Sequence, residues 1–416
     1  DKTIEEMVNQ GVRNAYLDKG NPLRASIVKN PISDRLNTKD NSPAVVHLSL
    51  VPGSDLDISI AAKGAGSENK AVLGMLNPSD NIVDFILGEI PKMGAGWCPP
   101  GVLGIGIGGT ADKAMVMAKE SLFETIDIQE LTKRGPSNKI ESLRVELYEK
   151  INLLGIGAQG LGGLTTVLDV KIKDYPTHAA SLPVAIIPNC AANRHIHFKM
   201  SGDGPVKLKP PNLEVWPKAE WSPKETSTRV NIDTLQKKDL GKFKLGQSLL
   251  LTGKILTARD AAHKKLKELA DNNQPLPDGL DLKNRFIYYV GPVDPVGNEV
   301  VGPAGPTTSS RMDKYSSLML EDYEIIGMIG KAERGKEALE SIKKNKAIYL
   351  IAVGGSAYLI SQAIKSSKLI AFPELGMEAI YEFEVEDMPV TLAANTDGES
   401  LHEEGVKKWN AVLMKD

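Results

Sequence analysis

Apolar residues recur along the chain in two patterns, short runs bounded by glycine or proline and longer stretches at helical spacing. The helical spacing predicts helices at residues 111–122, 141–153, 258–269 and 356–366. The short apolar runs predict strands at residues 45–50, 56–62, 184–187, 248–251, 286–290 and 347–353. The strand at 184–187 is expected to end at Pro188, and the helix at 356–366 follows the last strand. Strand, glycine turn and helix in succession indicate an α/β fold.

A segment near the middle of the chain interrupts this pattern. Residues 201–228 lack periodicity and contain five prolines, at positions 205, 210, 211, 217 and 223. We therefore expect two domains: an N-terminal α/β domain at residues 1–204 and a smaller C-terminal α/β domain at 229–416. Residues 205–228 would be a proline-rich linker, or a packed extended arm that covers Trp216 and Trp221.

Composition excludes several classes of protein. The 416 residues are 41% hydrophobic and 25% charged, as in ordinary globular proteins. A net charge of −3 indicates no nucleic-acid partner. No apolar run reaches 18 residues, so no membrane span is expected. Two cysteines do not make a disulfide framework, which favours a reducing compartment.

Both cysteines lie in settings that form loops. Cys98 occurs in Gly-Ala-Gly-Trp-Cys-Pro-Pro-Gly, and Cys190 in Ile-Pro-Asn-Cys-Ala-Ala-Asn-Arg-His. An isolated cysteine is most often a small buried apolar residue. A zinc site formed by Cys98, Cys190 and a histidine such as His195 is another alternative, but the 92-residue separation of the two cysteines fits compact zinc spacings poorly.

Glycine-rich segments and cations accompany the cysteines. Residues 104–113 resemble a phosphate cradle, but they match neither the Rossmann nor the P-loop spacing, so we expect a close backbone approach to a small anion or cofactor in a site shared with Cys98. A second such segment, residues 155–163, precedes His178. Arg259, Arg311 and Lys331 stand beside glycine turns or helix starts, which suggests an anionic small substrate.

Long motifs carry a resemblance that extends over essentially the whole chain. They occupy residues 93–101, 104–113, 155–166, 175–181, 187–192, 289–297, 302–308 and 372–379. With these motifs the chain resembles the iron–sulfur class I fumarate hydratases. The resemblance implies reversible hydration of fumarate to (S)-malate, a tricarboxylic acid cycle reaction, by a homodimer whose active site lies between two α/β domains.

The resemblance also implies a [4Fe–4S] cluster held by three cysteines, with one iron left open as a Lewis acid for the substrate. Cys98 and Cys190 match two of the three ligands. Such an open cluster is oxygen-sensitive. The family's first cluster cysteine belongs to a Cys-Gln-Asp-Thr-Gly motif that this sequence lacks. We therefore expect the third ligand in an upstream segment that is missing from this sequence.

The remaining site residues follow from the same motif matches. Thr307 matches the residue that moves a proton at the malate carbon, and His178 is expected in the active site as a contact of the substrate carboxylate and a catalytic residue. Four cations match contacts of the dicarboxylate substrate: Arg24, Arg259, Arg311 and Lys331. A threonine is a poor base on its own, so Thr307 would need cationic neighbours.

Alternatives remain open at this stage. A related hydro-lyase acting on tartrate or mesaconate would use the same cluster chemistry with different pocket residues. An inactive fragment without a cluster is the alternative from another class. The expected compartment is the cytoplasm or the mitochondrial matrix, both of which are reducing.

Overall fold

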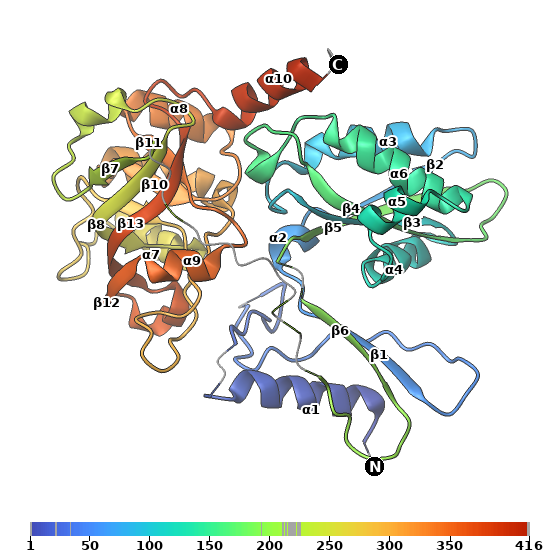
Figure 1. Cartoon of the computed structure of the whole chain (residues 1–416). Coiled ribbons are helices and arrows are strands. Elements are labelled where there is room, and N and C mark those ends of the chain that lie inside the picture. The colour runs from blue at the N-terminus through green and yellow to red at the C-terminus, as the bar shows by residue number, and fades with distance from the viewer. Residues whose placement is uncertain are drawn as a thin grey trace.

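The computed structural model describes residues 2–20, 23–33, 35–192, 194–209, 212, 214, 222 and 226–413. Three units are visible in Figure 1: an α/β unit from the first half of the chain, a second α/β unit from the second half, and a smaller unit that contains the N-terminus. The two α/β units confirm the predicted fold class. Trp216 and Trp221 and much of the predicted linker 205–228 lie outside the described residues.

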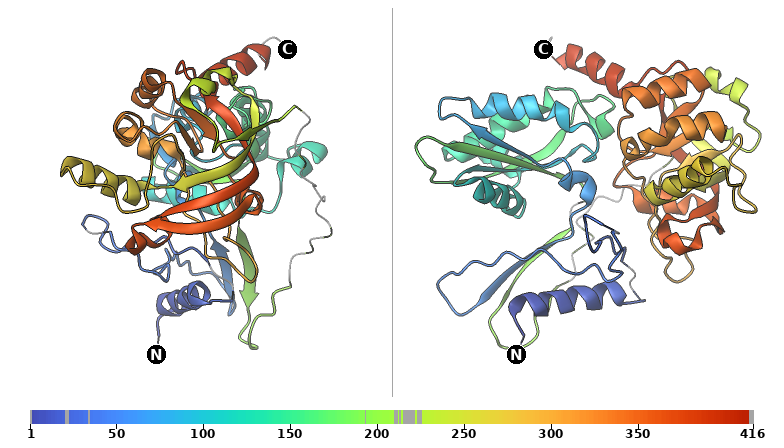
Figure 2. Two further views of the ribbon diagram at one scale, coloured as in Figure 1. Left: turned by 90° about the vertical axis from the view of Figure 1, so that its left-hand side faces the viewer. Right: turned by 180° about the vertical axis from the view of Figure 1, so that it is seen from behind.

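The first α/β unit is a four-stranded sheet covered by helices on both faces (Figures 1 and 2). Its strand order is β2-β5-β3-β4, and β5 runs antiparallel to both of its neighbours. The strands are β2 (Val72–Leu76), β3 (Gly101–Gly108), β4 (Val167–Tyr175) and β5 (Leu182–Cys190). The helices are α3 (Ile82–Glu89), α4 (Ala111–Ser121), α5 (Ile128–Arg134) and α6 (Lys139–Asn152).

The glycines of β3 bring this sheet close to α4. A Cβ on Gly104 or Gly106 would collide with the carbonyl oxygens of Ala118 or Ala114 in α4. The segment that resembled an anion cradle is therefore largely a strand, and its glycines serve helix–sheet packing. The expectation that residues 104–113 form an anion or cofactor loop shared with Cys98 is therefore wrong, because residues 104–108 belong to a strand that packs against α4.

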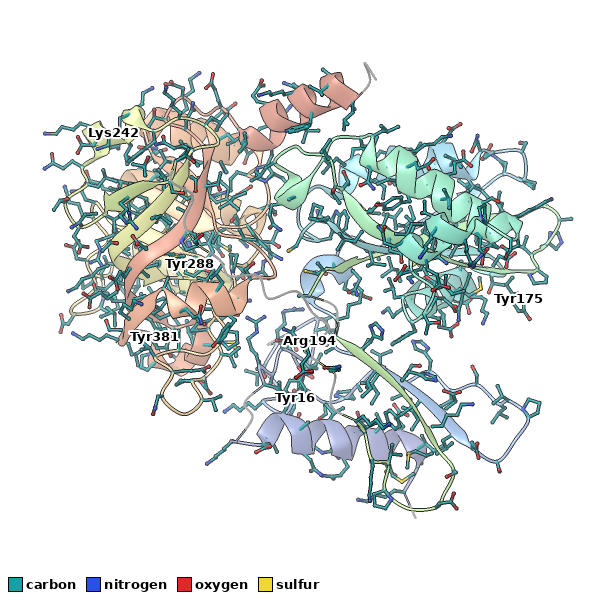
Figure 3. The ribbon with its side chains drawn as sticks, viewed as in Figure 1. Tyr16, Tyr175, Arg194, Lys242, Tyr288 and Tyr381 are labelled. Carbon is teal, nitrogen blue, oxygen red and sulfur yellow. The ribbon has the colours of Figure 1, made fainter. Side chains whose placement is uncertain are left out.

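The second α/β unit is a seven-stranded sheet of order β12-β13-β11-β10-β9-β8-β7. β13 pairs antiparallel with both β11 and β8, so the sheet closes on itself around a buried apolar core. Tyr288 lies in that core, and its hydroxyl donates to the carbonyl of Ala304 at 2.6 Å (Figure 3). The strands are β7 (Thr228–Asn231), β8 (Ser248–Thr257), β9 (Phe286–Tyr288), β10 (Gly327–Gly330), β11 (Ile348–Ile351), β12 (Ile364–Ala371) and β13 (Ile380–Ala394).

Helices surround the closed sheet and extend beyond it. They are α7 (Asp260–Asp271), α8 (Lys336–Asn345), α9 (Ala357–Gln362) and α10 (Leu401–Leu413). Short 3-10 or π turns complete both α/β units: η1 (Pro91–Met93), η2 (Ala158–Gly160), η4 (Lys237–Lys242), η5 (Ser309–Tyr315), η6 (Leu318–Asp322) and η7 (Pro373–Glu378). The last helix, α10, reaches across to the first unit, where a Cβ on Gly162 would collide with the Gly405 carbonyl and a Cβ on Gly405 would collide with the Leu161 carbonyl.

The third unit has no apolar core among its described residues. It consists of α1 (Ile4–Leu17), the antiparallel ribbon of β1 (Leu56–Ala61) and β6 (His195–Met200), and the chain around them, with α2 (Ala65–Glu68) leading into the first sheet (Figure 1). No residue of α1 is buried, and none of the four hydrophobic clusters includes a residue of this unit. Several of its large apolar side chains are therefore exposed, among them Met7, Leu17 and Leu50.

Most predicted elements are confirmed with shifted ends, and three are corrected. The segment 45–50 forms no strand, because the partner of β1 is β6, a distant segment. The helix predicted at 356–366 ends at Gln362, and β12 begins at Ile364. β5 was expected to end at Pro188, but it continues through this residue. A proline lacks the backbone N–H needed for pairing on both sides, but Pro188 lies beyond the last residue of β5 that pairs with β2, so it pairs with β3 only. Over the described part of the chain, no helix has the length and apolar character needed to cross a membrane.

Candidate active site

The two cysteines lie side by side at one end of the first sheet. Cys98 precedes β3 and Cys190 ends β5, and the pairing of Gly101 with Cys190 brings these two ends together. Cys98 is 5% exposed and has a left-handed backbone, with φ at 61°. Neither cysteine is in a disulfide. Residues 92 positions apart in the sequence thus form one centre.

Interaction between the two thiols shifts both pKa values. Hydrogen bonding to Cys190, followed by burial, raises the pKa of the Cys98 thiol. The contact with Cys98 lowers the pKa of Cys190 to about 6. Together the two groups share a proton, and the positive charge of Lys331 favours the thiolate form of each. Such a pair is suited to bind a metal, because the thiolate is the ligand form.

The second unit closes over the cysteines with a Gly354-Gly355 turn after β11. A Cβ on Gly354 would stand 2.7 Å from Cys98 Sγ, and one on Gly355 would stand 3.7 Å from Cys190 Sγ. Gln159, in the glycine-rich segment after α6, fastens this turn, since its Oε1 accepts from the Gly354 amide at 3.0 Å. Larger residues at position 354 would fill the space beside the sulfur.

The carboxyl ends of parallel strands β8 to β11 provide the rest of the site. Arg259 follows β8, Gly291 follows β9, and Lys331 follows β10. The carboxyl ends of parallel strands are where both open and closed α/β sheets usually bind ligands. Lys331 Nζ lies 2.7 Å from Cys98 Sγ, so the two units meet at the cysteine centre.

Three guanidinium groups gather at the same edge. Arg24 Nη1 donates to the Gly291 carbonyl at 3.0 Å, and Arg259 Nη1 would lie 2.6 Å from a Cβ on Gly291. Arg259 pairs with Glu378 at 3.4 Å. Burial and then repulsion from Arg259 lower the pKa of Arg24. The arginines are thus close enough to repel one another.

Arg311 joins this cluster to Thr307. Its Nη2 donates to Thr307 Oγ1 at 2.7 Å and lies 3.2 Å from the Asp260 carboxylate. Burial lowers the pKa of Arg311, Asp260 raises it, and Arg259 lowers it. Three guanidinium groups therefore face two carboxylates, Asp260 and Glu378, and Lys331 adds a further positive charge.

An unpaired donor also points to an anion. Arg259 Nε is buried and has no hydrogen-bond partner among the described residues. A buried donor without a partner costs free energy, on the order of 1–3 kcal/mol, unless a ligand satisfies it. The excess of positive charge and this donor both fit a small molecule with carboxylate groups.

His178 is not brought to this cluster within the chain. It lies in the turn between β4 and β5, where its Nδ1 accepts from the Ala180 amide at 3.1 Å. β5 runs from this turn to Cys190, a span of about 25 Å. Figure 3 places Tyr175, at the end of β4, on the outer side of the sheet, away from the second unit. The role expected of His178 stays a prediction.

Comparison with known proteins identifies the family. The model for fumarate hydratase (Fumerase) matches residues 1–199, and the model for the fumarase C-terminus matches residues 202–405. Fumarate hydratase 2 of Leishmania major is 34% identical over 96% of this chain and 72% of that protein. The anaerobic class I fumarate hydratase of Escherichia coli is 32% identical over 99% of this chain and 77% of that protein.

The chain belongs to the class I fumarate hydratase family. It is an enzyme of the lyase class, as the resemblance implied. A Methanocaldococcus jannaschii protein provisionally assigned as L(+)-tartrate dehydratase subunit alpha is 44% identical over 46% of this chain and 67% of that protein. The relatives therefore include proteins named as fumarate hydratases and a protein named as a tartrate dehydratase subunit.

The residues of this class I fumarate hydratase chain fit part of an iron–sulfur centre. The two thiols lie together, and a Gly-Gly turn passes so close to them that a Cβ on Gly354 would collide with Cys98 Sγ. Thiolates are the usual ligands of such clusters. Across the described residues, no group of three or more His, Cys, Asp or Glu side chains is arranged to hold a metal ion. The fit thus covers two ligands.

Sequence reasoning missed two residues that contact the cysteine segment. Gln159 holds the Gly354 turn, and Glu333 Oε2 accepts from the Ala95 amide at 2.8 Å. Gln159 stands inside a motif already noted, and its positive φ of 57° marks an unusual backbone. Glu333 follows Lys331, a predicted site residue, by two positions, and this proximity was the signal in the sequence that could have pointed to it.

Proposed function

We propose that the protein catalyses the reversible hydration of fumarate to (S)-malate. The observation that carries the proposal is a group of cations at the carboxyl ends of the parallel strands, of which Lys331 reaches Cys98: Arg24, Arg259, Arg311 and Lys331. A dicarboxylate brings two negative charges, and guanidinium groups bind carboxylates through paired hydrogen bonds. Family membership makes fumarate the first substrate to test.

The residues divide into two roles in this proposal. The arginines bind and orient the two carboxylates, which holds the reacting carbons at a fixed distance from the chain. During dehydration the deprotonated Thr307 Oγ1 takes the proton from the malate carbon, the C–O bond to the hydroxyl group breaks as the C=C bond forms, and the hydroxide together with that proton leaves as water. Hydration follows the same steps in reverse. The Arg311 guanidinium, which already donates to Thr307 Oγ1, stabilises the negative charge on that oxygen while its proton is transferred.

Cys98 and Cys190 would provide two of the thiolate ligands of a [4Fe–4S] cluster. When bound, the cluster supplies an open iron that acts as a Lewis acid toward the substrate. Lys331 remains near this centre to neutralise negative charge on a carboxylate. Oxygen sensitivity is expected for the same reason, since an open iron is exposed.

L(+)-tartrate is the second candidate substrate, because one relative carries that name. Tartrate is also a dicarboxylate and would use the same arginines. Mesaconate remains a third candidate on the same argument. Differences in the pocket, rather than in the cation cluster, would decide among the three.

A homodimer fits the third unit. Its exposed apolar side chains include Met7, Leu17 and Leu50, and a second copy of the chain would cover them. The predicted domains 1–204 and 229–416, the linker 205–228, and a reducing compartment, cytoplasmic or mitochondrial, also remain part of the proposal. A reducing compartment would keep both thiols free.

Turnover and iron content test the proposal together. The purified protein is reconstituted without oxygen, its iron and sulfide are measured, and its rates on fumarate, L(+)-tartrate and mesaconate are compared. We expect the highest kcat/KM on fumarate, and loss of both iron and turnover in Cys190→Ser. Ser59→Ala, which alters an exposed serine on β1, serves as the control.

Three results would contradict parts of the proposal. Faster turnover of tartrate would transfer the activity to the second candidate. Full iron content in Cys190→Ser would remove that residue from the ligands. Iron near zero in the wild-type chain, against about four per chain for a full cluster, would favour the inactive fragment.

A further inference from the structure

A short segment of the second unit reaches across to the loop that carries Cys98. The loop, residues 94–98, belongs to the first unit, and Ala95 is 238 positions before Glu333 in the sequence. Glu333 Oε2 nevertheless accepts from the Ala95 amide at 2.8 Å. A Cβ on Gly94 would collide with the same carboxylate, so Gly94 leaves room for it.

The hydrogen bond to Ala95 connects directly to the backbone of Cys98. The carbonyl of Ala95 accepts from the Cys98 amide at 3.0 Å, which closes a tight turn. Cys98 itself has a positive φ, a conformation that a non-glycine residue adopts only when its surroundings hold it there. Glu333 is therefore the residue of the second unit that fastens the start of this turn.

Glu333 is held in place by rigid neighbours. Ala332 has a φ of 65°, and its carbonyl accepts from the Tyr349 hydroxyl at 2.8 Å. The side chain of Arg334 is fully buried and donates to Asp313 at 2.6 Å and to Ser316 at 2.8 Å. These contacts fix the backbone on both sides of Glu333, so its carboxylate has little freedom to move away.

The same segment also carries Lys331, whose ammonium lies 2.7 Å from Cys98 Sγ. Lys331 and Glu333 thus reach the two ends of one loop from a single rigid strand end. His402, from α10, is also close, since the Glu333 carboxylate opposes the effect of burial, which lowers the pKa of His402. Nothing in the proposed chemistry requires Glu333 itself to touch a substrate.

We propose that Glu333 is a positioning residue that holds the Cys98 loop against the second unit through its reach to the Ala95 amide. Removing this contact frees the turn and exposes Cys98, whereas removing the charge alone does not. The contacts described above support the role of Glu333 in holding the loop. Only the importance of the loop position for catalysis rests on the proposed hydratase function.

Two variants test separately the length of the Glu333 side chain and its negative charge. Glu333→Asp keeps the charge but is one methylene shorter, so its carboxylate no longer meets the Ala95 amide. Glu333→Gln keeps the length and still offers an oxygen acceptor. Glu337→Asp, at an exposed position in α8, is the matched control. All three are conservative, which protects the fold.

The measurement is the rate at which iodoacetamide labels each cysteine of the full chain, kept reduced and free of iron by a chelator. The chain has two cysteines, so mass spectrometry of two peptides reads both sites. Cys98 is buried, so its labelling depends on local opening of the loop. We expect Glu333→Asp to raise the Cys98 rate about tenfold, while the Cys190 rate changes by less than about twofold.

Glu333→Gln should label like the wild type at both cysteines, and so should Glu337→Asp. An unchanged Cys98 rate in Glu333→Asp would overturn the proposal. Equal acceleration at both cysteines would also overturn it, because that result indicates general loosening. So would an effect of Glu333→Gln as large as that of Glu333→Asp. Labelling needs no turnover, so failure of the proposed reaction would leave this test readable.

Discussion

Arg311 shows how one side chain combines two functions at the residue scale. It stands 3.2 Å from Asp260 and donates to Thr307 at 2.7 Å, so it contributes both to the positive cluster and to the proposed proton-transfer group. Both contacts are made by the same nitrogen, Nη2. The guanidinium carries further N–H groups on Nε and Nη1, and its planar arrangement of donors suits bidentate binding of a carboxylate.

Replacing Arg311 should weaken substrate binding. Arg311→Met removes a charge-assisted hydrogen bond, which is worth roughly 1.5–3 kcal/mol, so we expect KM for malate to rise at least about tenfold with a fall in kcat. Steady-state kinetics of the reconstituted enzyme measures this. Arg229→Met, which removes an exposed pair with Asp387, is the control. Unchanged KM and kcat would exclude Arg311 from the site.

Single residues were predictable where their chemistry was visible. Cys98 and Cys190 stand in motifs and Lys331 stands beside a glycine turn, and the structure brings the three together. Glu333 and Gln159 were missed because their importance comes from contacts with residues far away in the sequence. Their proximity to a noted motif and to Lys331 does not show which distant residues they contact.

At the element scale, α7 holds Arg259 through a buried histidine. The His263 amide donates to the Arg259 carbonyl at 2.9 Å, and His263 Nδ1–H donates to the same oxygen at 2.8 Å. The ring is buried between Tyr289 and Tyr315, and Nε2 has no partner among the described residues. Burial lowers the pKa of His263 to about 4, against a smaller opposing effect of Asp260.

This lowered pKa predicts a pH-dependent contribution to stability. The unfolded chain binds a proton to His263 below pH 6.5, whereas the folded chain does so only below about pH 4. Stability from this group is therefore complete above pH 6.5 and is lost as the pH falls toward 4. The full difference is about 3 kcal/mol.

His263→Leu removes this titration and keeps a buried side chain of similar size. Urea unfolding of both proteins across this pH window should show the wild-type free energy of unfolding falling more steeply in acid than that of the variant. The hydrogen bond from Nδ1 is lost at every pH, so the slope and not the level is the readout. Parallel curves would show that His263 does not titrate on unfolding.

Elements were predicted best where one face is buried against a close neighbour in the sequence. The helices at Ala111–Ser121 and Lys139–Asn152 agree with their apolar spacing. β13 was missed although its first half alternates apolar and acidic residues, such as Phe383, Glu384 and Val385. It pairs with β12, which immediately precedes it, and also with β8, which lies far earlier in the chain, so long-range pairing contributes to defining it.

At the scale of the whole molecule, the third unit stands out for its exposed apolar surface. The exposed fractions are 53% for Met7, 60% for Leu17 and 52% for Ile60. A monomer rarely leaves so many large apolar side chains together in water. Figure 2 shows that this unit projects below both α/β units, where a second copy could reach it.

A charge on this surface should prevent dimerisation. Leu17→Glu places a carboxylate in the apolar surface of α1, and burying it in an interface would cost several kcal/mol. Light scattering on the eluting protein should give the mass of two chains for the wild type and of one for the variant. Val412→Glu, in the exposed last turn of α10, should remain dimeric. A wild-type monomer would refute the proposed dimer.

The sequence by itself determined the family, the α/β class and most residues of the cation cluster, because these depend on residue type within local motifs. Tertiary structure alone decided the closed second sheet, the pairing of β1 with β6 and the contact of Glu333 with Ala95. Each of these depends on contacts between segments separated by more than a hundred residues. Local spacing carries no information about which distant segments meet, since burial of apolar surface can be satisfied in many ways until the whole chain folds.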